Sequence, residues 1–254
     1  MSVDDVFLSR VGHDLRGELA TMVTGVHYVL RYEAELGDAA RQMLNRVHGA
    51  GQRLRRLLDE LDDAAWIDGG NRAALAVELC QADTLIQGAL ARLSQVVTAR
   101  EVTLDVRVPE DLPAFEADER LSGAAIEYLI DFALARSRRK ATHITVEEVQ
   151  GMPVLRIADE GGAIDDDVLA RLFEPFVEKD LVPPPEPGQR RRERLGLGLS
   201  IAHGILAAHG GVLCAEVVPG GTGIVFTCTL GRLGSAVELK KSTPSSCPAT
   251  QNVG

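Results

Sequence analysis

The chain has 254 residues, of which 45% are hydrophobic, enough for one large domain or two modest domains with apolar cores. Its 37 acidic residues outnumber its 27 basic ones, and the formal net charge of −10 argues against broad electrostatic binding to nucleic acid or to an anionic membrane. No stretch approaches the roughly 20 apolar residues of a membrane span, and the N-terminus lacks a signal-peptide pattern. We therefore expect a cytoplasmic protein whose partners are other proteins.

The first predicted element is a long helix. Apolar residues recur at alternating spacings of four and three from Leu8 to Val29, which is the pattern of a helix packed in a bundle. Residues 36–38 indicate a short break, after which helical spacing continues up to Trp66. The two helices would form an antiparallel hairpin. Because one hairpin would leave much of its apolar face exposed, we expect two copies to form a four-helix bundle in a homodimer.

A domain boundary is expected just after the second helix. Residues 67–72 form a polar, glycine-containing joint at which both composition and periodicity change. The sequence therefore predicts a helical hairpin domain over residues 1–68 and a second domain over residues 73–234. The tail over residues 240–254 lacks core residues and is expected to be disordered.

The second domain alternates strands and helices before it ends in antiparallel strands. The expected order begins with a strand at 74–78, a helix at 82–100, a strand at 102–108 and a helix at 122–136. Two strands follow, at 143–149 and 154–158, and then a short helix at 166–173 and a longer helix at 199–209. Strands at 211–217 and 224–230 end the domain. This order describes an α+β fold, an α/β sandwich with helices on one face of a mixed sheet.

His13 is the first candidate for chemistry. It lies one position beyond Gly12 on the apolar stripe of the first helix, so its ring should flank that stripe and stay accessible. Asp14 follows directly, and a carboxylate beside a histidine can accept its proton and leave one ring nitrogen nucleophilic. Taken alone, such a pair is more often a surface accident, so its meaning depends on the motifs downstream.

Four residues of the second domain could contact a nucleotide. Asp159 closes an apolar strand, where a carboxylate can accept a hydrogen bond from an adenine amino group, and Gly161 allows the chain to turn close beneath the base. Gly196 and Gly198 come just before a helix whose first backbone amides could face phosphate oxygens. Each pattern by itself also fits an ordinary turn or helix start.

Glu127 and Asp131 are candidate magnesium ligands. They are four residues apart, hence on one face of a predicted helix, and could hold Mg²⁺ directly or through water. By themselves, two such carboxylates would more often form a solvated helix face.

These segments follow the order of a known family. FLSRVGHDLRGEL resembles the phosphoacceptor box of sensor histidine kinases, ADERLSGAAIEYLIDFALARS the helix with two magnesium- and phosphate-facing asparagines, and IADEGGAI the D-x-G-x-G loop beneath adenine. LFEPF and RLGLGLSIAHGILAAHGG resemble the phenylalanine-bearing element and the second glycine box of the same ATP-binding domain. The resemblance covers roughly residues 6–231. It implies a GHKL-type ATP-binding domain behind a dimerisation and phosphotransfer hairpin.

The resemblance also implies an activity, that of a two-component histidine kinase. Mg-ATP bound in the second domain would phosphorylate His13, with Asp14 as its base, and His13 would pass the phosphate to an aspartate on a response-regulator receiver domain. The cofactors would be ATP and Mg²⁺, the metal being held by Asp131 and Glu127. Because only 12 residues precede His13, we expect the input signal to come from a partner such as a separate sensor protein, from a ligand that binds these two domains, or from the C-terminal tail.

The sequence departs from the family at several positions of the nucleotide site. Glu127 and Asp131 stand where the family has its paired asparagines, Leu134 stands where a lysine or arginine is usual, and Ala163 and Arg194 replace glycines. Two carboxylates that face a triphosphate without a compensating base would weaken its binding. The alternative is a degenerate kinase-fold protein. It would be either a phosphotransferase, whose His13 receives phosphate from another source, or an adaptor. The adaptor would bind a receiver domain or another kinase without using ATP.

Overall fold

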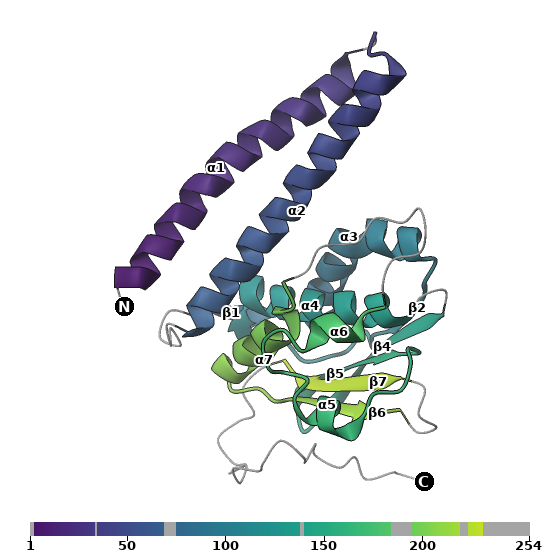
Figure 1. The fold of residues 1–254 in the computed structure, drawn as a ribbon. Helices are drawn as coiled ribbons and strands as arrows, with labels where there is room; N and C mark the ends of the chain where they lie inside the picture. The colour runs from purple at the N-terminus through teal and green to yellow at the C-terminus, as the bar shows by residue number, and fades with distance from the viewer. Residues whose placement is uncertain are drawn as a thin grey trace. The chain divides into compact units, whose positions relative to one another are not determined.

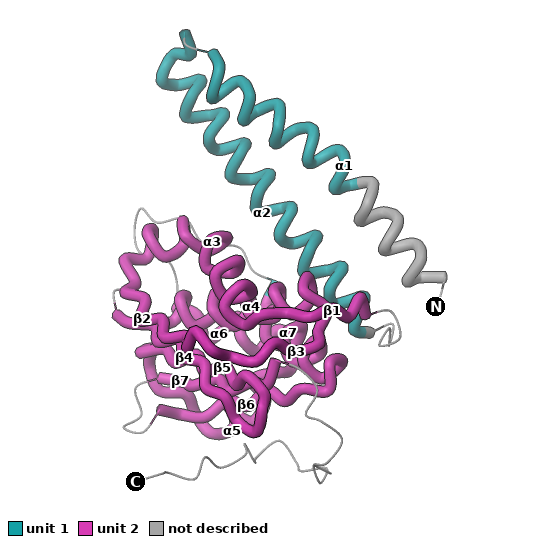
Figure 2. The backbone as a smooth tube through the Cα atoms, turned by 180° about the vertical axis from the view of Figure 1, so that it is seen from behind, with its two compact units in different colours: residues 1–71, 185–195 teal, residues 72–184, 196–254 magenta. Residues whose placement is uncertain are grey.

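The computed structural model describes residues 3–33, 35–68, 75–137, 140–183, 195–218 and 223–230, with side chains from residue 15 onward. Two compact units make up the chain, one of residues 1–71 and 185–195 and the other of residues 72–184 and 196–254 (Figure 2). The tail expected over residues 240–254 lies outside the described residues. No helix within the described ranges is both long and apolar enough to cross a membrane.

The first unit contains a hairpin of two long helices. Helix α1 (Val3–Tyr32) and helix α2 (Asp38–Asp68) run antiparallel, side by side (Figure 1). Gly51 lets them approach closely, since a Cβ at that position would collide with the Val23 side chain. Arg16 of α1 bonds to two carboxylates of α2. Its guanidinium donates hydrogen bonds to Asp62 and, at 3.2 Å, to Asp59.

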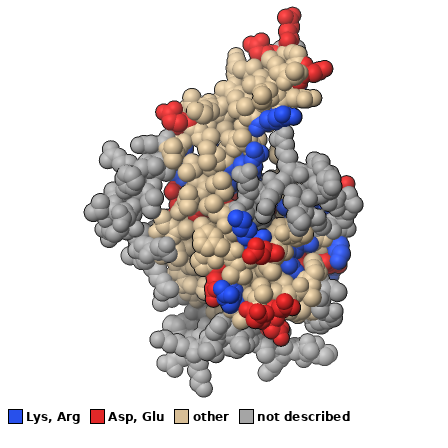
Figure 3. Space-filling view, in the orientation of Figure 1, with Lys and Arg blue, Asp and Glu red and all other residues tan. Residues whose placement is uncertain are grey.

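The hairpin exposes large apolar side chains that repeat every seven residues. They are Leu15 and Met22 on α1, and Val47, Leu54 and Leu61 on α2, each between 46% and 63% exposed. Figure 3 shows acidic side chains gathered at the loop end of the hairpin, whereas much of its long side is uncharged. A second hairpin laid on these two stripes would bury them, as the packing of a four-helix bundle does.

The second unit is organised around a five-stranded mixed sheet of order β2-β4-β5-β7-β6. Its strands are β2 (Thr103–Arg107), β4 (Ala141–Val149), β5 (Met152–Asp159), β6 (Leu213–Val217) and β7 (Ile224–Thr229). β2 runs parallel to β4, and all other neighbours are antiparallel. The tight turn between β4 and β5 has positive φ at both Gln150 and Gly151, which suits the right-handed twist of a hairpin.

A separate antiparallel ribbon pairs β1 (Val77–Cys80) with β3 (Phe115–Asp118). β1 begins three residues later than expected, and β3 was not predicted, because it is short, half acidic and becomes a strand only through its distant partner. β3 leads directly into helix α4. Its last residue caps that helix, since the Asp118 carboxylate accepts the Leu121 backbone N–H at 3.0 Å.

Helices α3 (Ala82–Arg100), α4 (Glu119–Ser137) and α7 (Gly198–Ala208) cover one face of the sheet (Figure 1). Helix α4 is central, because it packs on β4 and β5 and contacts both α3 and α7. Its Phe132 meets Phe226 of β7 edge to face, with ring centroids 5.7 Å apart, in the middle of the core. Two short helices, α5 (Asp166–Ala170) and α6 (Glu178–Leu181), complete the unit. The expected α+β architecture is confirmed.

Candidate functional site

The buried polar side chains of α4 are the first indication of a site. This helix is enclosed on most sides, and polar groups in such a position are normally paired. Asp131 and Arg136 are only 8% and 7% exposed. Arg136 lies at the C-terminal end of α4, next to the end of strand β5.

Asp159, the last residue of β5, is the partner of Arg136. It is 2% exposed, and its Oδ2 accepts a hydrogen bond from Arg136 Nε at 3.1 Å, while its Oδ1 accepts the Gly161 backbone N–H at 2.7 Å. Burial raises the pKa of the Asp159 carboxyl, and the positive Arg136 opposes that shift. Gly161 is required by this turn, because a Cβ there would lie 2.6 Å from Asp159 Oδ1.

Arg136 also binds two backbone carbonyls. One terminal nitrogen donates to the Leu181 oxygen at 3.3 Å, and the other donates to the Gly162 oxygen. The guanidinium thus joins the loop after β5 to helix α6. No sequence pattern singled out Arg136, since an arginine in the last turn of a helix ordinarily complements the helix dipole in solvent. Its role depends on Asp159, which only the fold brings beside it.

Gly196 and Gly198 lie at the start of α7, as the sequence indicated. Gly196 has a φ of 87°, which glycine adopts without strain, and Gly198 is the first residue of the helix. A Cβ on Gly198 would come within 3.2 Å of the Tyr128 ring of α4, so this glycine permits tight packing of the two helices.

A carboxylate of the same chain occupies the N-terminus of α7. The Leu199 backbone N–H donates to the carboxylate of Glu178, in α6, at 2.6 Å. Glu178 is 3% exposed, so this bond is shielded from water. Glu178 was not among the residues expected from the sequence. It lies 21 residues before Leu199, and no local sequence pattern predicts a contact over that separation.

The two candidate magnesium ligands share helix α4 but have different surroundings. Glu127 faces α3, where its carboxylate accepts a hydrogen bond from Arg92 Nε at 2.5 Å. Asp131 is buried one turn further along and makes an interaction of its own. Among the described residues, no group of three or more His, Cys, Asp or Glu side chains could hold a metal ion.

The structure therefore gathers part of the expected set. All four nucleotide candidates of the second unit lie at the end of β5 or the start of α7. They are Asp159 and Gly161 at the end of β5, and Gly196 and Gly198 at the start of α7. The backbone of the expected phosphoacceptor segment lies in α1 of the first unit. The side chains of His13 and Asp14 lie outside the described residues.

Comparison with known proteins identifies relatives that match most of the chain. Residues 118–232 match the family described as histidine kinase-, DNA gyrase B-, and HSP90-like ATPase. The chain is 27% identical over 226 residues to the sensor protein DivL of Caulobacter vibrioides, covering 88% of this chain and 27% of DivL. It is 25% identical over 221 residues to the sensor histidine kinase ZraS of Escherichia coli, covering 87% of this chain and 44% of ZraS. The chain thus spans less than half the length of these curated relatives.

A solved structure agrees with the fold. Full-length ShkA in complex with AMPPNP matches with a TM-score of 0.67 at 21% identity, covering 87% of this chain and 44% of that chain. At this identity the likeness concerns the fold alone. The expected fold class, a helical N-terminal region followed by a GHKL-type α/β domain, is confirmed.

Proposed function

We propose that this chain is a two-component histidine kinase that phosphorylates itself on His13, because residues 118–232 match the histidine kinase-, DNA gyrase B-, and HSP90-like ATPase family and most of the chain is similar to sensor histidine kinases. His13 would then pass the phosphate to an aspartate on a response-regulator receiver domain in the cytoplasm. The observation that carries the proposal is the combination in one chain of a helical hairpin, with the predicted acceptor segment in α1, and a domain that matches the ATPase family.

The second unit contains residues whose chemistry suits ATP, which would supply the phosphoryl group. Asp159 would accept a hydrogen bond from the adenine amino group, and Gly161 would let the chain pass beneath the base. The backbone around Gly196 and Gly198 would turn amides toward the phosphates, with the α7 dipole in support.

Two further roles belong to the proposal. Asp131 and Glu127 on α4 would hold Mg²⁺, since carboxylates are the ligands that this hard cation prefers, and Glu127 would then have to exchange its hydrogen bond with Arg92 for the metal. In α1, Asp14 would accept or hold the ring proton of His13 and leave the other ring nitrogen nucleophilic.

The proposed kinase would act as a homodimer joined through the hairpins. Replacing Met22 or Val47 by glutamate is expected to shift the protein from dimer to monomer, because each change would bury an unpaired charge between two hairpins. Sedimentation velocity of the full chain measures this shift. Ala20→Glu is the matched control, since this exposed residue lies on the opposite side of α1 from Met22 and the variant should stay dimeric. A dimer that survives both stripe substitutions would contradict the proposed interface.

Autophosphorylation is tested with the purified full chain, γ-labelled ATP and Mg²⁺. We expect acid-labile label on the wild type and a loss of at least about 100-fold in His13→Ala, because the alanine has no nucleophile. His27→Ala, which removes another histidine of the same helix, should retain the label. Label that persists in His13→Ala would show that the acceptor is another residue.

A second candidate function is that of a phosphotransferase, which would use His13 but take its phosphate from a separate phosphorylated protein. It is favoured by the hydrogen bonds that engage Asp159 with Arg136 and the Leu199 amide with Glu178. A phosphorylated receiver domain that labels His13, under conditions in which ATP does not, would favour this function over the kinase. An adaptor would acquire label by neither route.

A further inference from the structure

Both polar ends of the nucleotide site are bonded to other groups of the same chain. At the base end, the Arg136 guanidinium uses Nε for Asp159 and its two terminal nitrogens for the carbonyls of Leu181 and Gly162. A base amino group would need the Asp159 carboxylate to which this guanidinium is bound. Since the pair is almost completely buried, its bonds are not weakened by competing water.

At the phosphate end, the buried Glu178 carboxylate lies at the N-terminus of α7, where the proposed function places the nucleotide phosphates. It accepts the Leu199 backbone N–H at 2.6 Å, and a carboxylate at a helix N-terminus interacts favourably with the dipole, as a phosphate does. Two anions at this one position would repel each other. A nucleotide that used the N-terminus of α7 would therefore have to displace Glu178.

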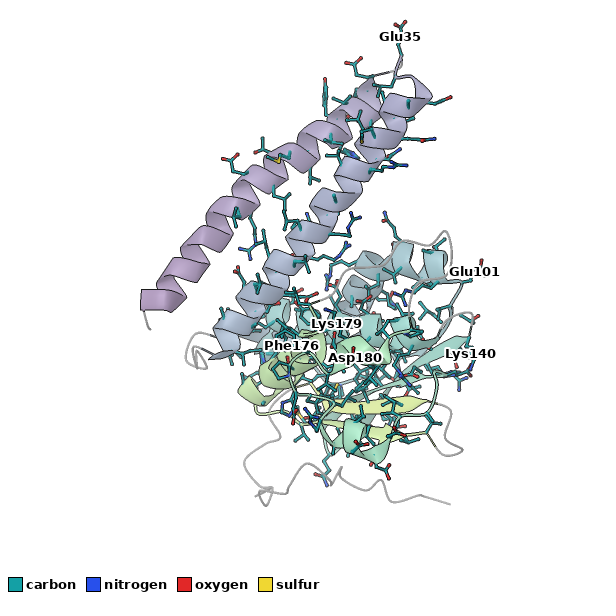
Figure 4. The ribbon with its side chains drawn as sticks, viewed as in Figure 1. Glu35, Glu101, Lys140, Phe176, Lys179 and Asp180 are labelled. Carbon is teal, nitrogen blue, oxygen red and sulfur yellow. The ribbon has the colours of Figure 1, made fainter. Side chains whose placement is uncertain are left out.

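A single segment joins the two ends. Residues 176–181, named here the internal strap, begin with the Phe176 N–H, which donates to the Gly196 carbonyl at 2.6 Å. They end with the Leu181 carbonyl, which accepts from Arg136. Gly196 lets the strap lie close, because a Cβ there would come within 3.2 Å of the Phe176 Cα. Figure 4 shows the strap residues Phe176, Lys179 and Asp180 close to one another in this part of the unit.

The strap begins with a strained residue. Phe176 has a φ of 73°, a left-handed conformation that is unfavourable for a bulky side chain, and the residue is 61% exposed. Burial of the ring therefore does little to offset the strain. The bonds that the strap makes to Gly196, Leu199 and Arg136 oppose it, so a ligand that competes for those bonds also releases the strain.

We infer that the internal strap is an autoinhibitory element, in which Glu178 stands in for a nucleotide phosphate and Arg136 for the amino group of the base. A nucleotide binds only after both internal partners have moved. This inference rests on the proposed function, because it concerns the regulation of the same site. It predicts a weak affinity for Mg-ATP that increases when the strap is loosened.

The test is Glu178→Gln, which keeps the size of the side chain and removes its negative charge. Isothermal titration calorimetry of the full chain, with Mg-ATP and separately with adenosine, gives the two affinities. We expect Mg-ATP to bind at least about tenfold more tightly to the variant than to the wild type, with the adenosine affinity unchanged. Glu174→Gln is the matched control, because it changes the net charge equally at an exposed residue that pairs with Arg171. Both of its affinities should equal those of the wild type.

Hydrogen exchange of the wild type gives an independent readout that does not rely on a variant. Saturating Mg-ATP should increase exchange at the amides of residues 176–181, since the strap loses its bonds when the nucleotide enters. Exchange that stays the same or slows there would overturn the inference. Equal Mg-ATP affinities of the folded wild type and Glu178→Gln would overturn it as well.

The same samples separate this inference from the proposed kinase activity. A tenfold gain in Mg-ATP affinity without label on His13 would support the strap and contradict the kinase. Label on His13 with equal Mg-ATP affinities would support the kinase and contradict the strap.

Discussion

Arg136→Ala is expected to lower the free energy of unfolding by about 3–5 kcal/mol, because it leaves the Asp159 carboxylate buried without its guanidinium. The side chains of the pair are 4% and 0% exposed, so water cannot replace the lost partner. Two backbone carbonyls, those of Leu181 and Gly162, would lose their donor in the same variant. Chemical denaturation followed by circular dichroism measures the change.

The loss in Arg136→Ala should depend on pH. Burial raises the pKa of the Asp159 carboxyl even with Arg136 present, so without the guanidinium the folded state would bind this proton still more tightly than the unfolded chain does. A group whose pKa is raised on folding contributes stability that is lost as pH rises through the folded-state pKa. The variant should therefore be closest to the wild type in acid and fall further below it towards neutral pH.

Two controls make this expectation specific to the buried pair. Arg171→Ala removes an exposed arginine from an ion pair with Glu174 and should change the unfolding free energy by less than about 1 kcal/mol. The double variant Arg136→Ala, Asp159→Ala should recover part of the loss, because no buried charge is left unpaired. If the double variant lost as much unfolding free energy as Arg136→Ala and Asp159→Ala lose together, the two side chains would not be coupled.

Gly223→Ala is expected to destabilise the second unit by about 3 kcal/mol, the upper range for overpacking a tight core. The added Cβ would collide with the backbone oxygen of Asp159 and lie 2.9 Å from its carbonyl carbon. A flexible side chain could move aside, but this backbone is held by the pairing of β5 with β7. Thermal unfolding of the full chain is the measurement.

Gly162→Ala is the matched control for Gly223→Ala. It adds the same methyl group in the loop after β5, where nothing lies within 4 Å of the new Cβ. Its melting temperature should stay close to that of the wild type. Equal melting temperatures for the two alanine variants would mean that the close approach of Gly223 to Asp159 costs nothing.

The elements of the fold were largely predictable, because their causes are local. Apolar residues spaced alternately by four and three positions lie on one side of a helix. This pattern predicted the hairpin of α1 and α2. Alternation and turn residues predicted the paired strands β4 and β5 in the same way. Strand β3 was missed, because its four residues become a strand only through pairing with β1.

In the candidate site, too, residues in local patterns were predictable, whereas residues that depend on distant partners were not. Asp159, Gly161, Gly196 and Gly198 could be proposed from the sequence, because a carboxylate at a strand end and glycines before a helix are local patterns. Arg136 and Glu178 were not found, since each meets its partner more than 20 residues away in the chain. A hydrogen bond between distant residues leaves no periodicity or spacing from which it could be read.

By itself, the sequence determined that a helical region precedes an α/β domain, and it predicted the acceptor segment in the first helix and the residue types that could meet a nucleotide. Only the tertiary structure decided what those residues contact, namely that Asp159 is bound to Arg136 and that the N-terminus of α7 is bound to Glu178. The physical reason is that residue type and spacing set what a group can bond to. Which partner it has depends on the groups that folding buries beside it, away from competing water.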